Sequence, residues 1–117
     1  MTFKEKFSYL DYDAAMQYVA ESEDIYKIIL ETYVTDQRLD ILNQAFAEKD
    51  WDRYRIEAHG VKSTSKTIGA NELSEEAKKM EFAVKEDNIQ IIIEHHEEFI
   101  KNYRDLVDRI MFDLKSL

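Results

Sequence analysis

The fold class of this chain is decided by residues 89–114, which read IQIIIEHHEEFIKNYRDLVDRIMFDL. Core-type residues recur here at alternating steps of four and three, which is the spacing of one face of an amphipathic helix. The residues of this stripe are Ile89, Ile93, His96, Ile100, Tyr103, Val107, Ile110 and Leu114, and Ile92, Phe99 and Leu106 widen it. Asn88 is expected to cap the helix. At 1.5 Å per residue the helix would be about 40 Å long, and we expect it to be the spine of a helical bundle.

Three more segments upstream carry helical stripes of the same period. One is expected to start after Asp50 and to end at Gly69, with an inner face made of Trp51, Tyr54, Ala58, Val61, Ser65 and Ile68. The next helical segment follows Asn71, and its inward-facing residues are Leu73, Ala77, Met80 and Val84. Another is marked by Leu39, Leu42 and Phe46 and ends near Lys49. Residues 13–20 and 22–34 are expected to add short N-terminal helical segments, with Ser22 as a cap and a break near Thr35 and Asp36.

The composition agrees with a helical protein. The chain has no proline and two glycines, 44% of its residues are hydrophobic and 35% are charged. Proline and glycine interrupt helices, and strand-like alternation is absent. We therefore predict an all-α fold in one domain, residues 1–117, with a bundle core at about residues 36–115.

Charge and cysteine content restrict the function classes. Lysine and arginine number 16 and aspartate and glutamate 25, so the formal charge is −9. This charge argues against a nucleic-acid or anionic-membrane partner and favours protein partners. The chain has no cysteine, so a disulfide framework and a thiolate metal site are excluded. No apolar run approaches the roughly 20 residues of a membrane span, and the N-terminus lacks the apolar region of a signal peptide. We expect a cytoplasmic, free-standing, monomeric protein.

A candidate site lies in residues 58–71, the longest stretch without a carboxylate. On a helix, Lys62 and Lys66 follow His59 by three and seven residues, so all three side chains project from one face. A neutral imidazole has a nucleophilic lone pair, and neighbouring ammonium groups compensate the charge of a phosphoryl group. The pattern suits a histidine that becomes phosphorylated beside compensating ammonium groups, and Lys62 is favoured as a functional residue. For Lys66 alone, a solvated surface lysine is the favoured interpretation.

Other chemistries find less support in the sequence. Ser63 follows His59 by four residues, but the segment has no carboxylate to orient the imidazole, so Ser-His hydrolysis is not expected. His95 and His96 are adjacent and diverge by about 100° on a helix, which makes them poor joint metal ligands. His96 lies on the inner stripe and is expected to be a hydrogen-bonded core histidine. The two glycines do not fit a P-loop, so the chain has no ATP site of its own. We predict no metal site and no cofactor.

Residues 59–70, HGVKSTSKTIGA, resemble the signature H-x-L-K-G-S-[SA]-x-x-[LI]-G-A of histidine-containing phosphotransfer (HPt) domains. The flanks agree, because residues 49–51 resemble the G-D-W/L turn of the family and residues 23–30 its early helix. Downstream, the family's L-x-x-x-A-x-x-L-E-x-A helix is matched by Leu73, Ala77, Met80, Glu81 and Ala83. The resemblance covers roughly residues 10–110. One departure is Ser63, where the family most often has glycine, while Gly60 follows the histidine directly.

The resemblance implies an antiparallel four-helix bundle that carries phosphoryl groups rather than an enzyme with its own turnover. It implies that His59 accepts a phosphoryl group from an aspartyl phosphate on a receiver domain and passes it to another receiver, with Lys62 as the phosphoryl-stabilising cation. Partners would be response-regulator receiver domains and a hybrid histidine kinase, and magnesium would come with the receiver. The small residues Gly60, Ser63 and Thr67, together with Lys66, would form a docking floor beside His59. A second possibility stays open, a bundle that docks a receiver or another protein without phosphoryl turnover.

Overall fold

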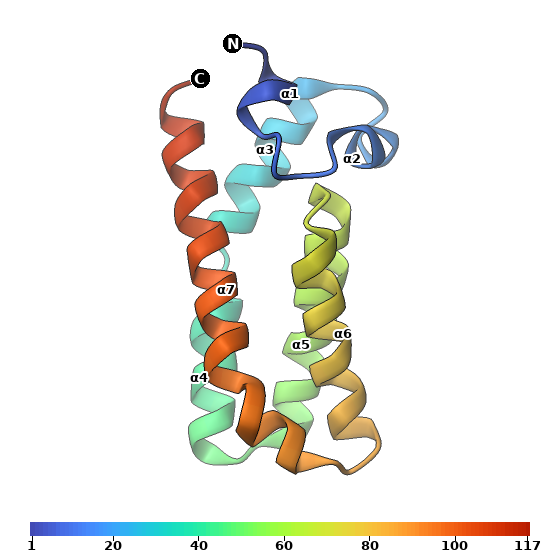
Figure 1. Cartoon of the computed structure of the whole chain (residues 1–117), viewed down its shortest axis with the longest axis vertical. Helices are drawn as coiled ribbons and strands as arrows, with labels where there is room; N and C mark the ends of the chain where they lie inside the picture. Colours follow the sequence, from blue (N-terminus) through green and yellow to red (C-terminus); the bar gives the residue numbers. More distant parts are fainter.

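The computed structural model describes all 117 residues and contains helices only. Seven helices follow one another along the chain: α1 (Phe3–Lys6), α2 (Tyr12–Tyr18), α3 (Glu23–Thr35), α4 (Arg38–Glu48), α5 (Trp51–Ile68), α6 (Asn71–Lys85) and α7 (Ile89–Lys115). Helices α4 to α7 alternate in direction, and α3 continues the line of α4 along α7 (Figure 1). The all-α, four-helix-bundle prediction is confirmed. No helix is both long enough and apolar enough to cross a lipid bilayer.

Helix α7 is the spine of the bundle, as predicted, but one part of its predicted inner face is wrong. Ile93 is 54% exposed, whereas Ile92 is fully buried. The run of isoleucines at 91–93 offers an apolar residue at three successive positions, so the period alone could not select the inward one. Packing against α4 and α6 selects Ile92, because it aligns with the buried His96, Phe99 and Tyr103.

The helix ends follow local capping chemistry. Ser22 and Asp50 accept hydrogen bonds from the backbone N–H of Ile25 and Arg53, each at 3.2 Å. Asn88 occupies the predicted cap position of α7, but its side chain makes no capping hydrogen bond. Lys49 ends α4 in the left-handed conformation, with a φ of 56°.

Gly69 ends α5 with a φ of 86°, a conformation that suits glycine. It also allows close approach of the N-terminal segment, because a Cβ atom at this position would lie 2.5 Å from the carbonyl oxygen of Asp11. The backbone N–H of Asp11 donates to the carbonyl oxygen of Gly69 at 2.9 Å. Gly69 therefore joins α5 to the segment that covers this end of the bundle.

The N-terminal segment contributes to the core instead of lying loosely on it. Phe7, Ala15, Met16 and Val19 are buried, and the hydroxyl of Tyr26 donates to the carbonyl oxygen of Ile68 at 2.7 Å. The core of 24 buried hydrophobic residues therefore runs from Phe7 to Ile110 and begins well before residue 36. These contacts hold the C-terminal end of α5, and thus the register of the helix that carries His59.

His96 is a core histidine with hydrogen-bond partners, as predicted. Its Nδ1 lies 2.8 Å from the hydroxyl of Tyr54, its Nε2 lies 2.9 Å from Oδ1 of Asn43, and its ring stacks on Phe46 with centroids 4.0 Å apart. Burial lowers the pKa of His96 to about 4, so the ring is neutral at pH 7. This histidine therefore serves the fold.

Candidate functional site

The site is built where α5 and α6 pack closely side by side. Each helix buries small residues, such as Ala58 on α5 and Ala77 on α6, which allow closely packed backbones. The hydroxyl of Ser74 on α6 donates to the carbonyl oxygen of Lys62 on α5 at 2.8 Å. This cross-helix hydrogen bond fixes the register in which α6 presents its side chains to His59.

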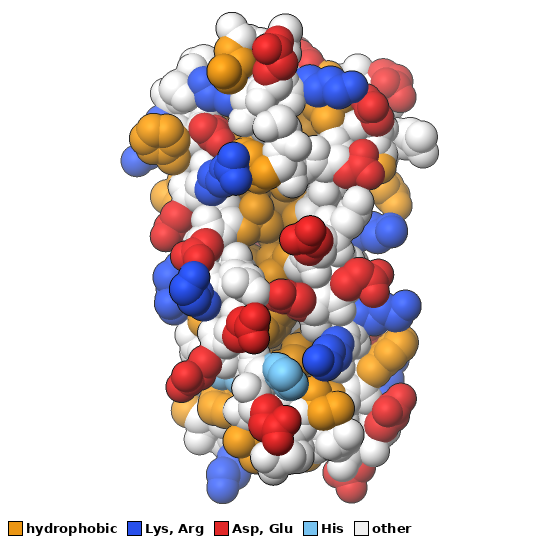
Figure 2. Space-filling view, in the orientation of Figure 1, with side chains coloured by type: hydrophobic (Ala, Val, Ile, Leu, Met, Phe, Trp, Pro, Cys, Tyr) orange, Lys and Arg blue, Asp and Glu red, His pale blue; other side chains and the backbone are white.

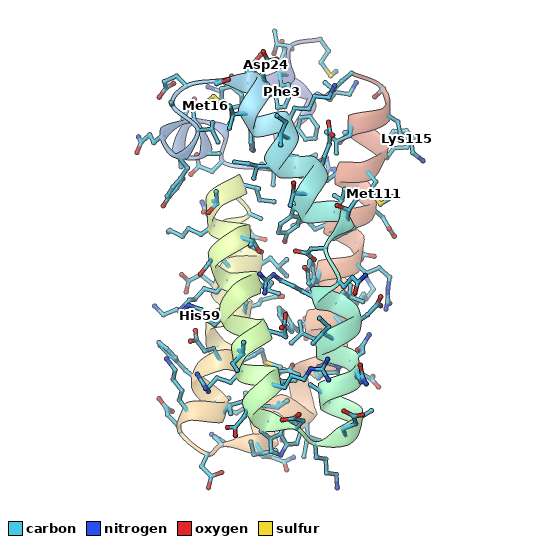
Figure 3. All side chains as sticks on the ribbon, turned by 180° about the vertical axis from the view of Figure 1, so that it is seen from behind. Phe3, Met16, Asp24, His59, Met111 and Lys115 are labelled. Carbon is cyan, nitrogen blue, oxygen red and sulfur yellow. The ribbon has the colours of Figure 1, made fainter.

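His59 projects from near the middle of α5 (Figure 3), and its side chain is 56% exposed. Its Nδ1 lies 2.8 Å from Oε2 of Glu81, which reaches across from α6 and whose side chain is only 2% exposed. Nε2 makes no hydrogen bond within the chain. An exposed imidazole is thus held by one nitrogen, and the other nitrogen is free to react.

Glu81 also binds two lysines. Its Oε1 lies 2.7 Å from Nζ of Lys62, and its Oε2 lies 3.2 Å from Nζ of Lys85. Burial by itself would raise the pKa of Glu81, but the hydrogen bonds from Lys62, His59 and Lys85 outweigh burial and lower the pKa to about 2. The carboxylate is therefore ionised at pH 7 and can only accept hydrogen bonds.

The ionised carboxylate determines the tautomer of His59. Because Glu81 can only accept, Nδ1 of His59 must carry the proton of their hydrogen bond. In the neutral ring the lone pair then belongs to Nε2, the nitrogen that has no hydrogen bond within the chain. This is the arrangement of a nucleophilic imidazole whose second nitrogen is oriented by a buried carboxylate.

The sequence did not predict the role of Glu81. The stretch around His59, residues 58–71, has no carboxylate, and for this reason we expected no carboxylate to orient the imidazole. That expectation is wrong, because the carboxylate comes from α6. The available signal was the position of Glu81 within an otherwise apolar inward stripe, next to Met80. Ser63 is exposed and makes no hydrogen bond to His59, so no Ser-His pair forms.

Lysines gather around the site although the chain is acidic. The ammonium groups of Lys62, Lys78 and Lys85 lie 5.8, 5.6 and 5.2 Å from the ring centroid of Phe82, which is 39% exposed. Cations are attracted to the face of an aromatic ring, so Phe82 supports all three. Lys66 is exposed and belongs to no ion pair, in agreement with a solvated lysine.

Gly60 is not the open floor that the sequence suggested. The guanidinium of Arg38 lies over it, and a Cβ atom at Gly60 would come within 1.9 Å of Nη1 of Arg38. This guanidinium is held by Glu57 at 3.2 Å and by Asp36 at 3.5 Å. Gly60 therefore makes room for a side chain of α4, and the accessible small residues of this face are the exposed Ser63 and the partly buried Thr67.

Nothing in the structure gathers ligands for a metal ion. No group of three or more histidine, cysteine, aspartate or glutamate side chains has a suitable arrangement. His96 is engaged in the core, and the neighbouring His95 lies apart from it on the α6 side, in a small pocket with Glu76, Lys79 and Glu98.

A cavity of about 740 Å³ lies between α6, α7 and residues 8–11, and His59 does not line it. Figure 2 shows hydrophobic side chains at the bottom of a hollow on this face of the molecule. Glu76 lines the cavity and accepts a hydrogen bond from Asn102 at 2.7 Å, and burial raises its pKa. His59 lines neither this cavity nor the small pocket at His95, and its side chain is 56% exposed, so a protein partner can reach it.

Comparison with known proteins agrees with this geometry. No curated protein and no solved structure gives a significant match. The Hpt domain family, in contrast, matches residues 29–111, a range that holds α4, α5, α6 and most of α3 and α7 together with His59, Lys62 and Glu81. Since this match spans most of the chain and contains the whole α5–α6 site, the protein belongs to the Hpt domain family.

Proposed function

We propose that this protein is a phosphocarrier of a multistep phosphorelay, in which Nε2 of His59 accepts a phosphoryl group from the aspartyl phosphate of a receiver domain and passes it to another receiver. The observation that carries the proposal is the hydrogen bond from Nδ1 of His59 to the buried Glu81, which leaves the lone pair on the exposed Nε2. Membership of the Hpt domain family supports the same role.

The transfer needs little from this chain beyond the nucleophile. The lone pair of Nε2 attacks phosphorus, the N–P bond forms, and the bond between phosphorus and the aspartyl oxygen breaks, which releases the receiver's carboxylate. The proton on Nδ1 remains in its hydrogen bond, so the ring becomes cationic and the negative charge of Glu81 stabilises it. The receiver brings the magnesium ion that neutralises charge during transfer. The reverse sequence delivers the group to the next receiver.

Lys62 is placed to stabilise the phosphoryl group. It stands one helical turn from His59 on the same face of α5, and its ammonium is 2.7 Å from the carboxylate that binds Nδ1. A lysine side chain has four rotatable bonds, so the ammonium can move from Glu81 toward a group on Nε2. We therefore assign to Lys62 the task of compensating phosphoryl charge in transit and on the phosphorylated protein.

The receiver docks on the outer face of α5 around His59. This face offers Ile56, whose side chain is 56% exposed one turn before His59, together with Ser63 and Thr67. Phe82 and Lys85 lie beside this face on α6, and Lys62 reaches the ring of Phe82 from α5. An exposed apolar residue flanked by cations suits a receiver's active site, which is rich in carboxylates and binds magnesium. Lys66, which is exposed and belongs to no ion pair, extends this cationic surface along α5.

The test is transfer from a labelled donor. A receiver domain that carries radioactive aspartyl phosphate is incubated with the protein, and acid-labile, base-stable label is expected on the parent. His59→Gln should keep the parent's helical content by circular dichroism and accept no label, whereas His95→Gln should be labelled as the parent is. Binding of the receiver without any label on the parent would instead support a docking module that does not turn over.

A further inference from the structure

Glu81 has more positive partners than one carboxylate requires. Its side chain is 2% exposed, and it pairs with both Lys62 and Lys85, at 2.7 and 3.2 Å, while it also accepts from His59. A buried carboxylate needs a compensating charge, and one ammonium supplies it. In a chain of net charge −9, the second ammonium at this position calls for a separate explanation.

The two lysines differ in what they can reach. Lys62 shares α5 with His59, one turn away, so it can follow a group that is attached to Nε2. Lys85 lies on α6 four residues after Glu81, and it contacts Oε2, the same oxygen that accepts from His59. Both ammonium groups lie over the ring of Phe82, at 5.8 and 5.2 Å from its centroid. Lys85 can therefore keep Glu81 compensated when Lys62 moves.

The charges of the phosphorylated site indicate why both lysines are present. A phosphoryl group brings about two negative charges, and Glu81 adds one. The Nδ1-protonated ring and the ammonium groups of Lys62 and Lys85 supply three positive charges, so the phosphorylated cluster is close to neutral. Without Lys85, Glu81 and the phosphoryl group would have to share the single positive charge of Lys62.

We propose that Lys85 is a positioning residue that takes over Glu81 when His59 is phosphorylated, so that Lys62 can leave the carboxylate and pair with the phosphoryl group. This proposal rests on the phosphocarrier role of His59. Lys85 itself does not contact the phosphoryl group. It acts through Glu81, and its effect therefore depends on the presence of Lys62.

The experiment uses phosphoramidate as a chemical phosphoryl donor, which needs no partner protein. Nε2 attacks its phosphorus, the P–N bond breaks and ammonia leaves. Lys85→Met is expected to slow phosphorylation of His59 by about threefold or more, within the usual range of coupling between contacting residues. Lys85→Arg, which keeps the cation, should restore most of the rate. Lys78→Met is the matched control, because its ammonium lies 5.6 Å from the same ring but does not pair with Glu81.

The decisive comparison is made in the absence of Lys62. In a Lys62→Met background, Lys85→Met should change the rate little further, because there is no ammonium left to release. Additive losses would overturn the proposal, and so would equal rates for the parent, Lys78→Met and Lys85→Met. Rates are compared at a temperature at which circular dichroism shows every variant folded, and rescue by Lys85→Arg separates a charge effect from a defect in folding. No label on the parent would overturn the phosphocarrier role itself, whereas label on the parent with no effect of Lys85 overturns only this inference.

Discussion

Oε2 of Glu81 lies 2.8 Å from Nδ1 of His59, so a buried carboxylate of α6 holds the imidazole of α5 by one of its two nitrogens. The two residues are 22 positions apart in the chain. Their hydrogen bond selects the tautomer, fixes the ring orientation, and makes the chemistry of His59 depend on the register between two helices.

Removal of this carboxylate should slow phosphorylation without abolishing it. In Glu81→Ala the proton of the neutral ring can reside on either nitrogen, and the cationic ring that forms on transfer loses its partner. We expect the rate with phosphoramidate to fall about 10-fold, which corresponds to about 1.4 kcal/mol of transition-state stabilisation. Nitrogen-15 NMR of His59 should show mixed tautomers. Glu81→Gln keeps a hydrogen-bond acceptor but not the charge, so its phosphorylation rate should lie between the rates of the parent and of Glu81→Ala. A Glu81→Ala protein with the parent's rate and tautomer would refute the role of Glu81.

The effect of Gly60→Ala on the free energy of unfolding should depend on the Arg38 guanidinium that covers this residue. An alanine in a helix is favoured over glycine by about 0.5–1 kcal/mol, but a Cβ atom here would displace Arg38, whose Nη1 would be only 1.9 Å away. We expect the gain to be cancelled in the parent and to appear in an Arg38→Ala background. Urea unfolding of the four proteins in this double-mutant cycle measures the difference. The same gain in both backgrounds would show that Arg38 does not restrict Gly60.

A pair of exposed isoleucines tests the docking face. Ile56 and Ile93 are 56% and 54% exposed, but Ile56 lies one turn from His59 on α5 and Ile93 lies on α7. Ile56→Glu should weaken receiver binding by about 10-fold or more, as expected for an apolar contact residue at an interface. Labelling by phosphoramidate should be unchanged, because that reaction needs no docking. Calorimetric titration with the receiver measures the affinity. Ile93→Glu is the matched control and should bind as the parent does. Equal affinities of the two variants would show that the receiver does not dock at Ile56.

The stability of the fold should depend on pH through His96. Its pKa is lowered by burial from 6.5 to about 4, so between these values the unfolded chain binds a proton that the folded chain does not. Stability should therefore fall as the pH decreases from 6.5 to 4, by up to about 3 kcal/mol. Urea unfolding at several pH values measures the slope. His96→Gln should lose much of it while His95→Gln keeps it, and an unchanged slope in His96→Gln would show that another group is responsible.

A second loss is expected at lower pH and has a different cause. The folded pKa of Glu81 is about 2, below the ordinary value of 4.5, so the stability that its hydrogen bonds provide is present above pH 4.5 and is lost as the pH falls toward 2. Glu81→Gln should remove this lower phase and leave the His96 phase in place. The two phases can thus be assigned separately in the same unfolding series.

The sequence by itself determined the helices and singled out His59 as the candidate nucleophile. Helical period, caps and terminators act over a few residues, so Ser22, Asp50 and Gly69 could be read directly as helix boundaries, and His59 with Lys62 could be placed on one face of one helix. The inner placement of His96 followed from the same period. These are properties of neighbours in the chain, and the structure confirms the helix boundaries and the inner placement of His96.

Only the tertiary structure decided which side chains from other helices contact each helix face. The partner of His59 comes from another helix, the side chain over Gly60 comes from α4, and the choice between Ile92 and Ile93 depends on the packing of α7. Such relationships are set by the crossing and register of helices, which depend on the summed packing of many side chains and not on any local pattern. The sequence thus pointed to the residue that we propose to react, and the packing of α5 against α6 determined which of its two nitrogens is left without a hydrogen bond.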